Sequence, residues 1–519
     1  MSLIPGASAR ASAFQPMAAV KFYTRLTWSN WLSTHLRPGY GPTWSVIDWF
    51  AREQFASGME RCVVLDLPGL SARYVGPSAP NMQAFVERGR MVPLQPVLPA
   101  LNCTMQATFL TGRYPSEHGI VGDGWLNREL GEVRFWPQSD GLVQTPQLWD
   151  AARKLDPSFT CARVCWFMNM YSKADYAITP QPSFTADGRV VPDVFTEPLH
   201  LRKPLVEALG NFPAYDYWGP RYSIRSSEWI ADVAMWLEQR HSPTLSLVFL
   251  PHLDYTPHTF GPNAKEIHKS LREIDDVVGK LIGFYESRGV RVIILSEFGA
   301  VPVSRAVHLN RLFRRRGWLA IREEGGRDVV YPSGSEAFAV ADMQIAHIYV
   351  RNPALLDEVK ALVEAEPGVA QVLDAEGKRA HHLDHPRSGE LVALAEPDAW
   401  FTYFYWLDDA RAPDYARTVD IYRKPGYDPL EMFVDPKLGL RMLELGGSVV
   451  KEKLGVRSRL EVVSMDGSLL KGAHGLPTGP EDGPVLMTRH GELIEAETLH
   501  ATQVHDLILA HLTGQQAAA

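Results

Sequence analysis

The sequence predicts an α/β fold in which helices flank a central, largely parallel sheet and a cap domain is inserted late in the chain. Two observations carry this prediction. Residues 62–66, 245–250 and 292–295 are short aliphatic runs, each followed by a polar or Pro-Gly turn, as buried strands are. Residues 265–288 have apolar side chains at helical spacing and stop at Gly289. Strand, helix and strand in this order predict parallel pairing.

Side chains that bind metals follow each predicted strand. Asp66 ends the first run, and Glu297 follows the third. The second is followed by PHLDYTPH, which contains Asp254 and His258. Active sites in open parallel sheets lie at the carboxyl ends of the strands, so we expect these groups to meet. One aspartate there would be an ordinary turn residue, whereas three strands that deliver carboxylate or imidazole groups favour a bound divalent cation.

Changes in composition divide the chain into four regions. We expect a tryptophan-rich N-terminal extension, a metal-binding α/β core, an inserted cap or lid, and a return segment that completes the core and the metal site. These regions are residues 1–60, 61–327, 328–436 and 437–519. The aromatic run 400–406 in the cap either lines a substrate pocket or packs as a core strand. His474 in the return segment lies between small residues, which suits a ligand better than a core residue.

Composition excludes several classes of function. The 519 residues are 45% apolar, and the net charge of −8 comes from interspersed charges, so a nucleic acid polymer is not the expected partner. A small-molecule substrate is expected instead. There is no apolar segment of the roughly 18 residues that span a bilayer. The four cysteines form neither a disulfide framework nor a paired zinc motif, which predicts a cytoplasmic protein. The sequence does not predict an oligomeric state.

Four motifs, in their order and spacing, resemble the alkaline phosphatase superfamily and are closest to its nucleotide pyrophosphatase/phosphodiesterase and phosphonoacetate hydrolase branch. They are Asp66 after a strand, the run Thr111–Gly119, the Asp254-x3-His258 pair, and the late His474-Gly475. The resemblance covers residues 62–310 and resumes near His474. It implies an alkaline phosphatase-like core that holds one or two divalent ions, with zinc expected first and manganese or magnesium as alternatives.

In this resemblance, Asp254, His258 and His474 hold one ion. The second ion would take Asp66, the nucleophile and an Asp-His pair, but that pair is replaced here by Glu297 and Phe298. Phenylalanine cannot bind a metal, so the second site is weakened, altered in its preference or vacant. His308 in the same loop either supplies the missing nitrogen or is an ordinary polar loop residue.

The stretch that begins NCTMQATFLTGRYPSEHG resembles the family's catalytic loop as it enters a helix. The family's nucleophile lies nine residues before Thr111, and Asn102 occupies that position. An amide is not a useful nucleophile, and Thr104 would serve only if the loop were reshaped by two residues. Asp123 stands where the branch has an asparagine that contacts a phosphoryl oxygen, which a carboxylate would repel. Taken alone, Asp123 is also compatible with a plain turn.

We therefore expect a metal-dependent hydrolase of the phosphodiesterase or pyrophosphatase type that acts on a phosphorylated small molecule. Because Asn102 cannot attack, a metal-activated water is the expected nucleophile, with Asp123 or Glu297 as general base. Two alternatives stay open. One is a metalloenzyme of the same fold that acts on a non-phosphoryl substrate, and the other is a non-catalytic ligand-binding protein.

Overall fold

The computed structural model describes residues 58–186, 190–441 and 461–515. The described residues from Met59 onward form one compact unit. The predicted tryptophan-rich extension therefore lies almost wholly outside the described residues, and the boundaries at 327 and 436 stay predictions. No helix within the described residues is long and apolar enough to cross a membrane.

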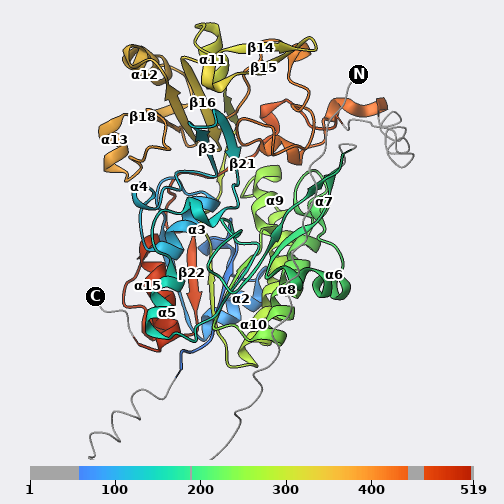
Figure 1. Ribbon diagram of the computed structural model, residues 1–519, viewed down its shortest axis with the longest axis vertical. Helices are drawn as coiled ribbons and strands as arrows, with labels where there is room; N and C mark the ends of the chain where they lie inside the picture. The colour runs from blue at the N-terminus through green and yellow to red at the C-terminus, as the bar shows by residue number, and fades with distance from the viewer. Residues whose placement is uncertain (1–57, 187–189, 442–460, 516–519) are drawn as a thin grey trace, which may run out of the picture. The chain divides into compact units, whose positions relative to one another are not determined.

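A nine-stranded sheet forms the centre of the fold (Figure 1). Its strand order is β23-β2-β22-β11-β1-β10-β5-β6-β9. Their bounds are β1 Cys62–Asp66, β2 Arg90–Gln95, β5 Cys161–Val164, β6 Tyr176–Pro180, β9 Val194–Glu197, β10 Leu245–Phe249, β11 Arg291–Leu295, β22 Val485–Thr488 and β23 Leu499–His500. β1 pairs in parallel with both β10 and β11, so the three predicted strands are neighbours with the predicted direction. β22 and β9 pair antiparallel with their neighbours β11 and β6.

Helices cover both faces of this sheet, because successive residues of a strand point to opposite sides. Val63 and Leu65 of β1 belong to the apolar cluster formed with α2 (Pro80–Glu87), α8 (Arg225–His241) and α10 (Ile267–Glu286). Cys62 and Val64 belong to the cluster formed with α3 (Asn102–Thr111), α5 (Leu148–Leu155) and α15 (Val504–Thr513). The largely parallel sheet between helices is thus confirmed, and α10 is the predicted helix 265–288.

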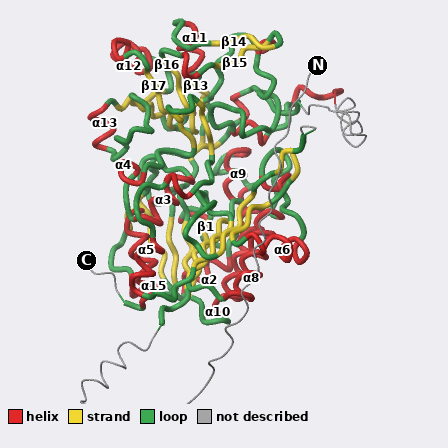
Figure 2. Tube along the Cα trace, viewed as in Figure 1, coloured by secondary structure: helices red, strands yellow, loops and turns green. Residues whose placement is uncertain are grey.

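A second, four-stranded antiparallel sheet lies within the region predicted as a cap (Figure 2). It contains, in spatial order, β16 (Ala337–Asp342), β17 (Ile345–Val350), β19 (Leu391–Ala395) and β18 (Val369–Leu373), and two helices, α12 (Leu356–Glu364) and α13 (Ala375–Ala380), lie between its strands in the chain. The aromatic run 400–406 is buried in the same apolar cluster as these strands. Of the two alternatives for that run, core packing is the one observed.

Shorter elements complete the described chain. Besides short 3-10 turns, the remaining α-helices are α4 (Pro115–His118), α6 (Arg202–Leu209), α7 (Ala214–Tyr217), α9 (His252–Phe260) and α11 (Leu309–Arg315). The remaining strands form pairs: β3 (Gly124–Asn127) with β4 (Glu132–Phe135), β7 (Ser183–Phe184) with β8 (Val190–Val191), β12 (Val301–Pro302) with β21 (Gly472–Ala473), β13 (Arg305–Val307) with β20 (Ala399–Phe401), and β14 (Ile321–Glu324) with β15 (Arg327–Val330).

The segment expected to be a catalytic loop is helical from its first residue. α3 begins at Asn102 and ends at Thr111, where Gly112 adopts a left-handed conformation with φ of 65°. Asn102 therefore occupies the first turn of a helix, where backbone N–H groups lack partners within the helix and the dipole favours negative charge. Helical phase, rather than strand alternation, decides which side chains of this segment face the site.

Candidate active site

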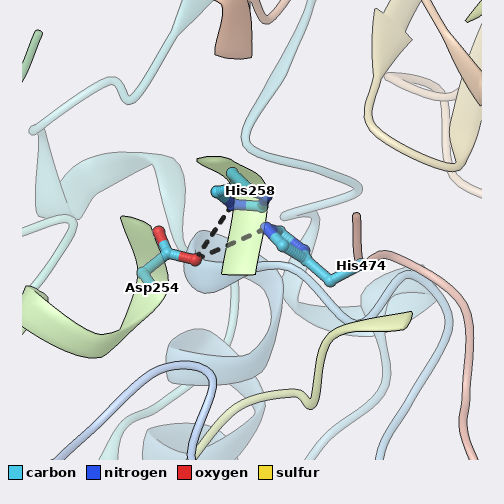
Figure 3. A group of neighbouring side chains, drawn as sticks. All are labelled: Asp254, His258 and His474. Atoms are coloured by element: carbon cyan, nitrogen blue, oxygen red, sulfur yellow. Dashed lines mark ion pairs between the residues drawn. The ribbon is translucent and has the colours of Figure 1, made fainter. Parts of the chain in front are cut away.

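Asp254, His258 and His474 converge on one point at the carboxyl end of the sheet (Figure 3). Asp254 and His258 lie four residues apart on α9, which follows β10, so they share one face of the helix. His474 directly follows β21, which lies next to β12. One ligand atom from each residue lies within 4.8 Å of the others. The three ligands that the resemblance implied for one ion are therefore brought together.

A backbone carbonyl fixes the orientation of His258. Its Nδ1 lies 2.8 Å from the carbonyl oxygen of Gly472, which can only accept, so Nδ1 carries the hydrogen. In the neutral ring Nε2 is then a bare lone pair, and it lies 3.2 Å from Asp254 Oδ1. In the described part of the chain Nε2 has no hydrogen-bond partner. A carbonyl that orients a histidine in this way is the usual support of a metal-binding imidazole.

His474 is held in a similar way. Its Nδ1 lies 3.3 Å from the Ala100 carbonyl oxygen, and its Nε2 lies 3.9 Å from Asp254 Oδ1. Burial lowers the pKa of His474 to about 3, so the ring is neutral near neutral pH. The Phe298 ring stacks on it with centroids 3.6 Å apart and fixes its plane.

These contacts direct two imidazole lone pairs and a carboxylate at the same space. Groups of this kind repel one another or stay unpaired unless a cation lies between them. One oxygen and two nitrogen ligands with a further position open match the donor set of catalytic zinc sites. Gly472 is required for this geometry, because a Cβ there would collide with the Pro257 carbonyl oxygen of α9.

Asp66 and Glu297 lie in a second group, in which the Gln106 amide bridges them and the Asn102 amide contacts Glu297. The Gln106 Nε2 donates to Asp66 Oδ2 at 2.9 Å and to Glu297 Oε1 at 2.8 Å. The Asn102 Nδ2 lies 3.2 Å from Glu297 Oε2. Burial raises the pKa of Asp66 to about 7, and burial together with the nearby Asp66 carboxyl raises the pKa of Glu297 well above its usual range.

Thr104 and His308 do not join either group. Thr104 lies two residues after Asn102 on α3, about 200° around the helix from it. Its hydroxyl is buried and has no hydrogen-bond partner among the described residues. His308 Nδ1 bonds to the Thr402 hydroxyl at 2.6 Å, and its ring stacks on Phe404. Of the two alternatives for His308, the structure therefore favours a residue engaged away from the ligands.

Asp123 approaches the start of α3 and pairs with an aspartate from the second sheet. Its Oδ1 accepts the Cys103 N–H at 2.7 Å, and its own N–H donates to Asp342 Oδ2 at 2.9 Å. Burial raises the pKa of Asp123 to about 6, and raises the pKa of Asp342 well above its usual range. Asp123 is thus more than a turn residue, because it is a buried carboxyl beside the predicted reacting position.

Four aromatic residues adjoin these carboxyl groups. The backbone N–H of Trp136 donates to the Asp123 carbonyl oxygen, and the backbone N–H of Tyr427 donates to the Ala341 carbonyl oxygen. Tyr255 directly follows Asp254 in α9. The Trp136 and Tyr427 ring centroids are 5.1 Å apart, and Trp218 lies 5.8 Å from Tyr427 and 5.9 Å from Tyr255. Trp136 has φ of 45°, a costly conformation for a bulky residue and one that is common at functional sites.

Sequence reasoning missed Gln106, Asp342 and the aromatic group. Gln106 had a usable signal, because it lies one helical turn after Asn102 and so faces the same side of α3. Asp342 ends β16, far along the chain from Asp123, and no local pattern links the two. Asp342 and Tyr427 both come from the region predicted as a cap, so this region contributes side chains beside the site.

Known proteins share this fold. A family model described as type I phosphodiesterase / nucleotide pyrophosphatase matches residues 62–428. An uncharacterized pyrophosphatase/phosphodiesterase of Schizosaccharomyces pombe is 25% identical over 261 residues, which are 48% of this chain and 47% of that protein. The chain thus spans about half the length of the curated relative that it matches.

Two solved structures cover most of the chain. Murine ectonucleotide pyrophosphatase/phosphodiesterase 5, as an inactive variant in complex with AMP, superposes with a TM-score of 0.54 at 14% identity, over 89% of this chain and 96% of that one. Phosphonoacetate hydrolase of Sinorhizobium meliloti with bound phosphonoformate gives a TM-score of 0.54 at 14% identity, over 88% and 95%. At this identity the likeness concerns the fold, and it confirms the predicted fold class.

Replacing His258 by alanine is expected to lower the affinity for zinc by at least about 100-fold, because residues that merely orient a ligand already contribute 10- to 100-fold. Elemental analysis and competition with a chelator measure this affinity. His252→Ala is the matched control, since His252 lies buried on the same helix and contacts Glu273 instead of Asp254. Equal zinc affinity in the wild type and His258→Ala would show that these residues do not hold the ion.

Proposed function

The chain belongs to the type I phosphodiesterase / nucleotide pyrophosphatase family, and on this premise we propose that it is a divalent-metal-dependent hydrolase of phosphate esters or anhydrides of a small molecule. The observation that carries the proposal is the convergence of Asp254, His258 and His474 within 4.8 Å, with both imidazoles oriented by backbone carbonyls. Zinc is the first expectation for this donor set, and manganese or magnesium are alternatives. When bound, such an ion supplies Lewis-acid polarisation of a phosphoryl oxygen and lowers the pKa of a coordinated water.

Attack by water follows from the residues at the start of α3. Asn102 offers an amide where the family's nucleophile is expected, and an amide does not attack phosphorus. The Thr104 hydroxyl faces away from Asn102 and Gln106 on the same helix. Water therefore forms the new bond to phosphorus, the bond to the leaving oxygen breaks, and no covalent enzyme intermediate forms.

Asp123 is the best placed general base. A base works best when its pKa lies near the working pH, and burial raises the pKa of Asp123 to about 6. The Cys103 N–H donates to one carboxylate oxygen, Oδ1, at 2.7 Å and so orients the carboxyl group. Asp342 receives the Asp123 N–H and so positions the Asp123 backbone.

The aromatic group supports binding of the part of the substrate that does not react. The rings of Trp136, Trp218 and Tyr427 contact one another, and Trp218 also contacts Tyr255, which follows Asp254 in α9. Aromatic side chains in such places bind apolar or planar ligand groups through large contact areas. Specificity then depends partly on the region 328–436, which contributes Tyr427.

A second candidate is a metal-dependent enzyme for a substrate without a phosphoryl group. The observation that favours it is the group of four buried carboxyls, Asp66, Asp123, Glu297 and Asp342. Among the described residues, the groups that shift their pKa values most are other carboxyls and neutral hydrogen-bond donors, and not lysine or arginine side chains. Buried carboxyl groups without a neutralising lysine or arginine disfavour a phosphoryl dianion and favour neutral or cationic ligand groups.

A panel of phosphate monoesters, phosphate diesters and nucleotide pyrophosphates, assayed with zinc, manganese and magnesium, tests the proposal directly. Turnover above the metal blank is expected for at least one class, and the His258→Ala variant should lose it. If no member of the panel turns over although the purified protein contains metal, the hydrolase proposal fails and the second candidate takes its place.

Removing the Thr104 hydroxyl is expected to change kcat/KM by no more than about threefold, since the hydroxyl does not attack. Thr104→Val preserves the side-chain volume, and Thr104→Ala checks the result. Loss of a true nucleophile would instead lower kcat on the order of a millionfold. A collapse of that size in both variants, or a trapped phosphoenzyme in the wild type, would restore Thr104 as the nucleophile.

Asp123→Asn is expected to lower kcat by about 10²- to 10⁴-fold, which is the usual contribution of a general base. The base must be ionised, so wild-type kcat/KM should fall as the pH drops below about 6, the raised pKa of Asp123. The residual kcat/KM of Asp123→Asn should not fall as the pH drops below about 6. A pH profile with the same fall in both proteins would assign the proton transfer to another group.

A further inference from the structure

The residues around Asp66 and Glu297 do not fit the second ion that the family resemblance implies. We propose that this chain holds a single catalytic ion and that the Gln106 side-chain amide holds the two carboxyl groups in place of the second. The inference rests on the proposed function for the first ion, at Asp254, His258 and His474. It assigns Gln106 the role of a positioning residue.

The direction of the Gln106 amide is fixed by its surroundings. The backbone N–H of Phe167 lies 2.7 Å from Gln106 Oε1, and an N–H can only donate, so the oxygen end must face Phe167. The NH2 end then faces the carboxyl groups and donates to Asp66 at 2.9 Å and to Glu297 at 2.8 Å. Both amide hydrogens point at the carboxyl pair. A cation there would meet the positive end of the amide dipole.

Few oxygen lone pairs remain for an ion. Both Glu297 oxygens accept from amides, because Asn102 Nδ2 lies 3.2 Å from the one that Gln106 does not contact. Asp66 Oδ1 is the carboxylate oxygen of this pair without a donor among the described residues. Zinc needs about four ligands and magnesium about six.

The imidazole that would complete a second site is absent from the surrounding residues that the structure describes. Phe298 stacks on His474 with an interplanar angle of 7°, so its ring supports the first ligand group and offers no ligand. His308 bonds to Thr402 instead. Over the described ranges, Asp254, His258 and His474 are the one set of three His, Cys, Asp or Glu residues whose ligand atoms lie within 4.8 Å of one another.

Metal stoichiometry tests this inference without an activity assay. The full-length protein is equilibrated separately with excess zinc, manganese and magnesium, freed of unbound metal, and analysed for metal per chain. The wild type is expected to bind one ion and His258→Ala none. Gln106→Glu replaces the NH2 by an oxygen at almost the same shape, so it is expected to bind a second ion, most readily magnesium or manganese.

Gln147→Glu is the matched control for this change. Gln147 is also a buried glutamine that donates to a carboxylate, Asp140, at 3.0 Å, but it lies outside the site. Its stoichiometry should stay at one. Should Gln106→Glu fail to fold by circular dichroism, the double variant Gln106→Ala with Phe298→His removes the amide and supplies an imidazole. Its cobalt form should then show a second set of visible absorption bands.

The outcomes separate this inference from the proposed function. Two ions in the wild type, with any of the three metals, overturn the single-ion inference and leave the proposed hydrolase intact. No ion in the wild type overturns the proposed metal site itself. If the wild type binds one ion and no folded Gln106 variant binds a second one, the proposed role of Gln106 as the replacement for the second ion is overturned.

Discussion

The burial of several carboxyl groups at one end of a parallel sheet is the constraint on which the rest of this site depends. Asp66, Asp123, Asp254, Glu297 and Asp342 are all at most 8% exposed. An ionised carboxylate moved away from water costs several kcal/mol unless a partner compensates it. Each group therefore needs a cation, a proton or a hydrogen-bond donor. The kind of partner that each one finds decides what the site can do.

The structure provides different partners on neighbouring strands. Asp254 faces two imidazoles whose Nδ1 atoms point at backbone carbonyls, an arrangement that directs their Nε2 atoms at a cation. Asp66 and Glu297 face the amide hydrogens of Gln106 and Asn102, an arrangement that provides donors in place of a cation. Asp123 accepts a backbone N–H at the first turn of α3, where the helix dipole favours its charge. The carboxyl groups at this end of the sheet thus lie in three different electrostatic environments.

The scaffold keeps these environments apart because rigid elements support each of them. α9 presents Asp254 and His258 on one face, and Gly472 lets β21 approach closely enough to orient His258. α3 presents Asn102 and Gln106 on one face, and Phe167 fixes the direction of the glutamine. Side chains held in this way do not need to reorganise when a ligand binds, which favours catalysis through fixed electrostatics.

The sequence alone determined the parallel strands, the helix between two of them, and the residue types at the strand ends, because aliphatic runs and helical spacing are local patterns. It also showed the Asp254-x3-His258 spacing, although only the structure shows that this segment is helical. Tertiary structure decided the rest. His474, Asp342 and Tyr427 approach the site from distant parts of the chain, His308 turns to Thr402, and the run 400–406 packs in a core. These contacts depend on how the chain connects its strands and helices and on how they pack together, and a local periodicity in the sequence does not encode them.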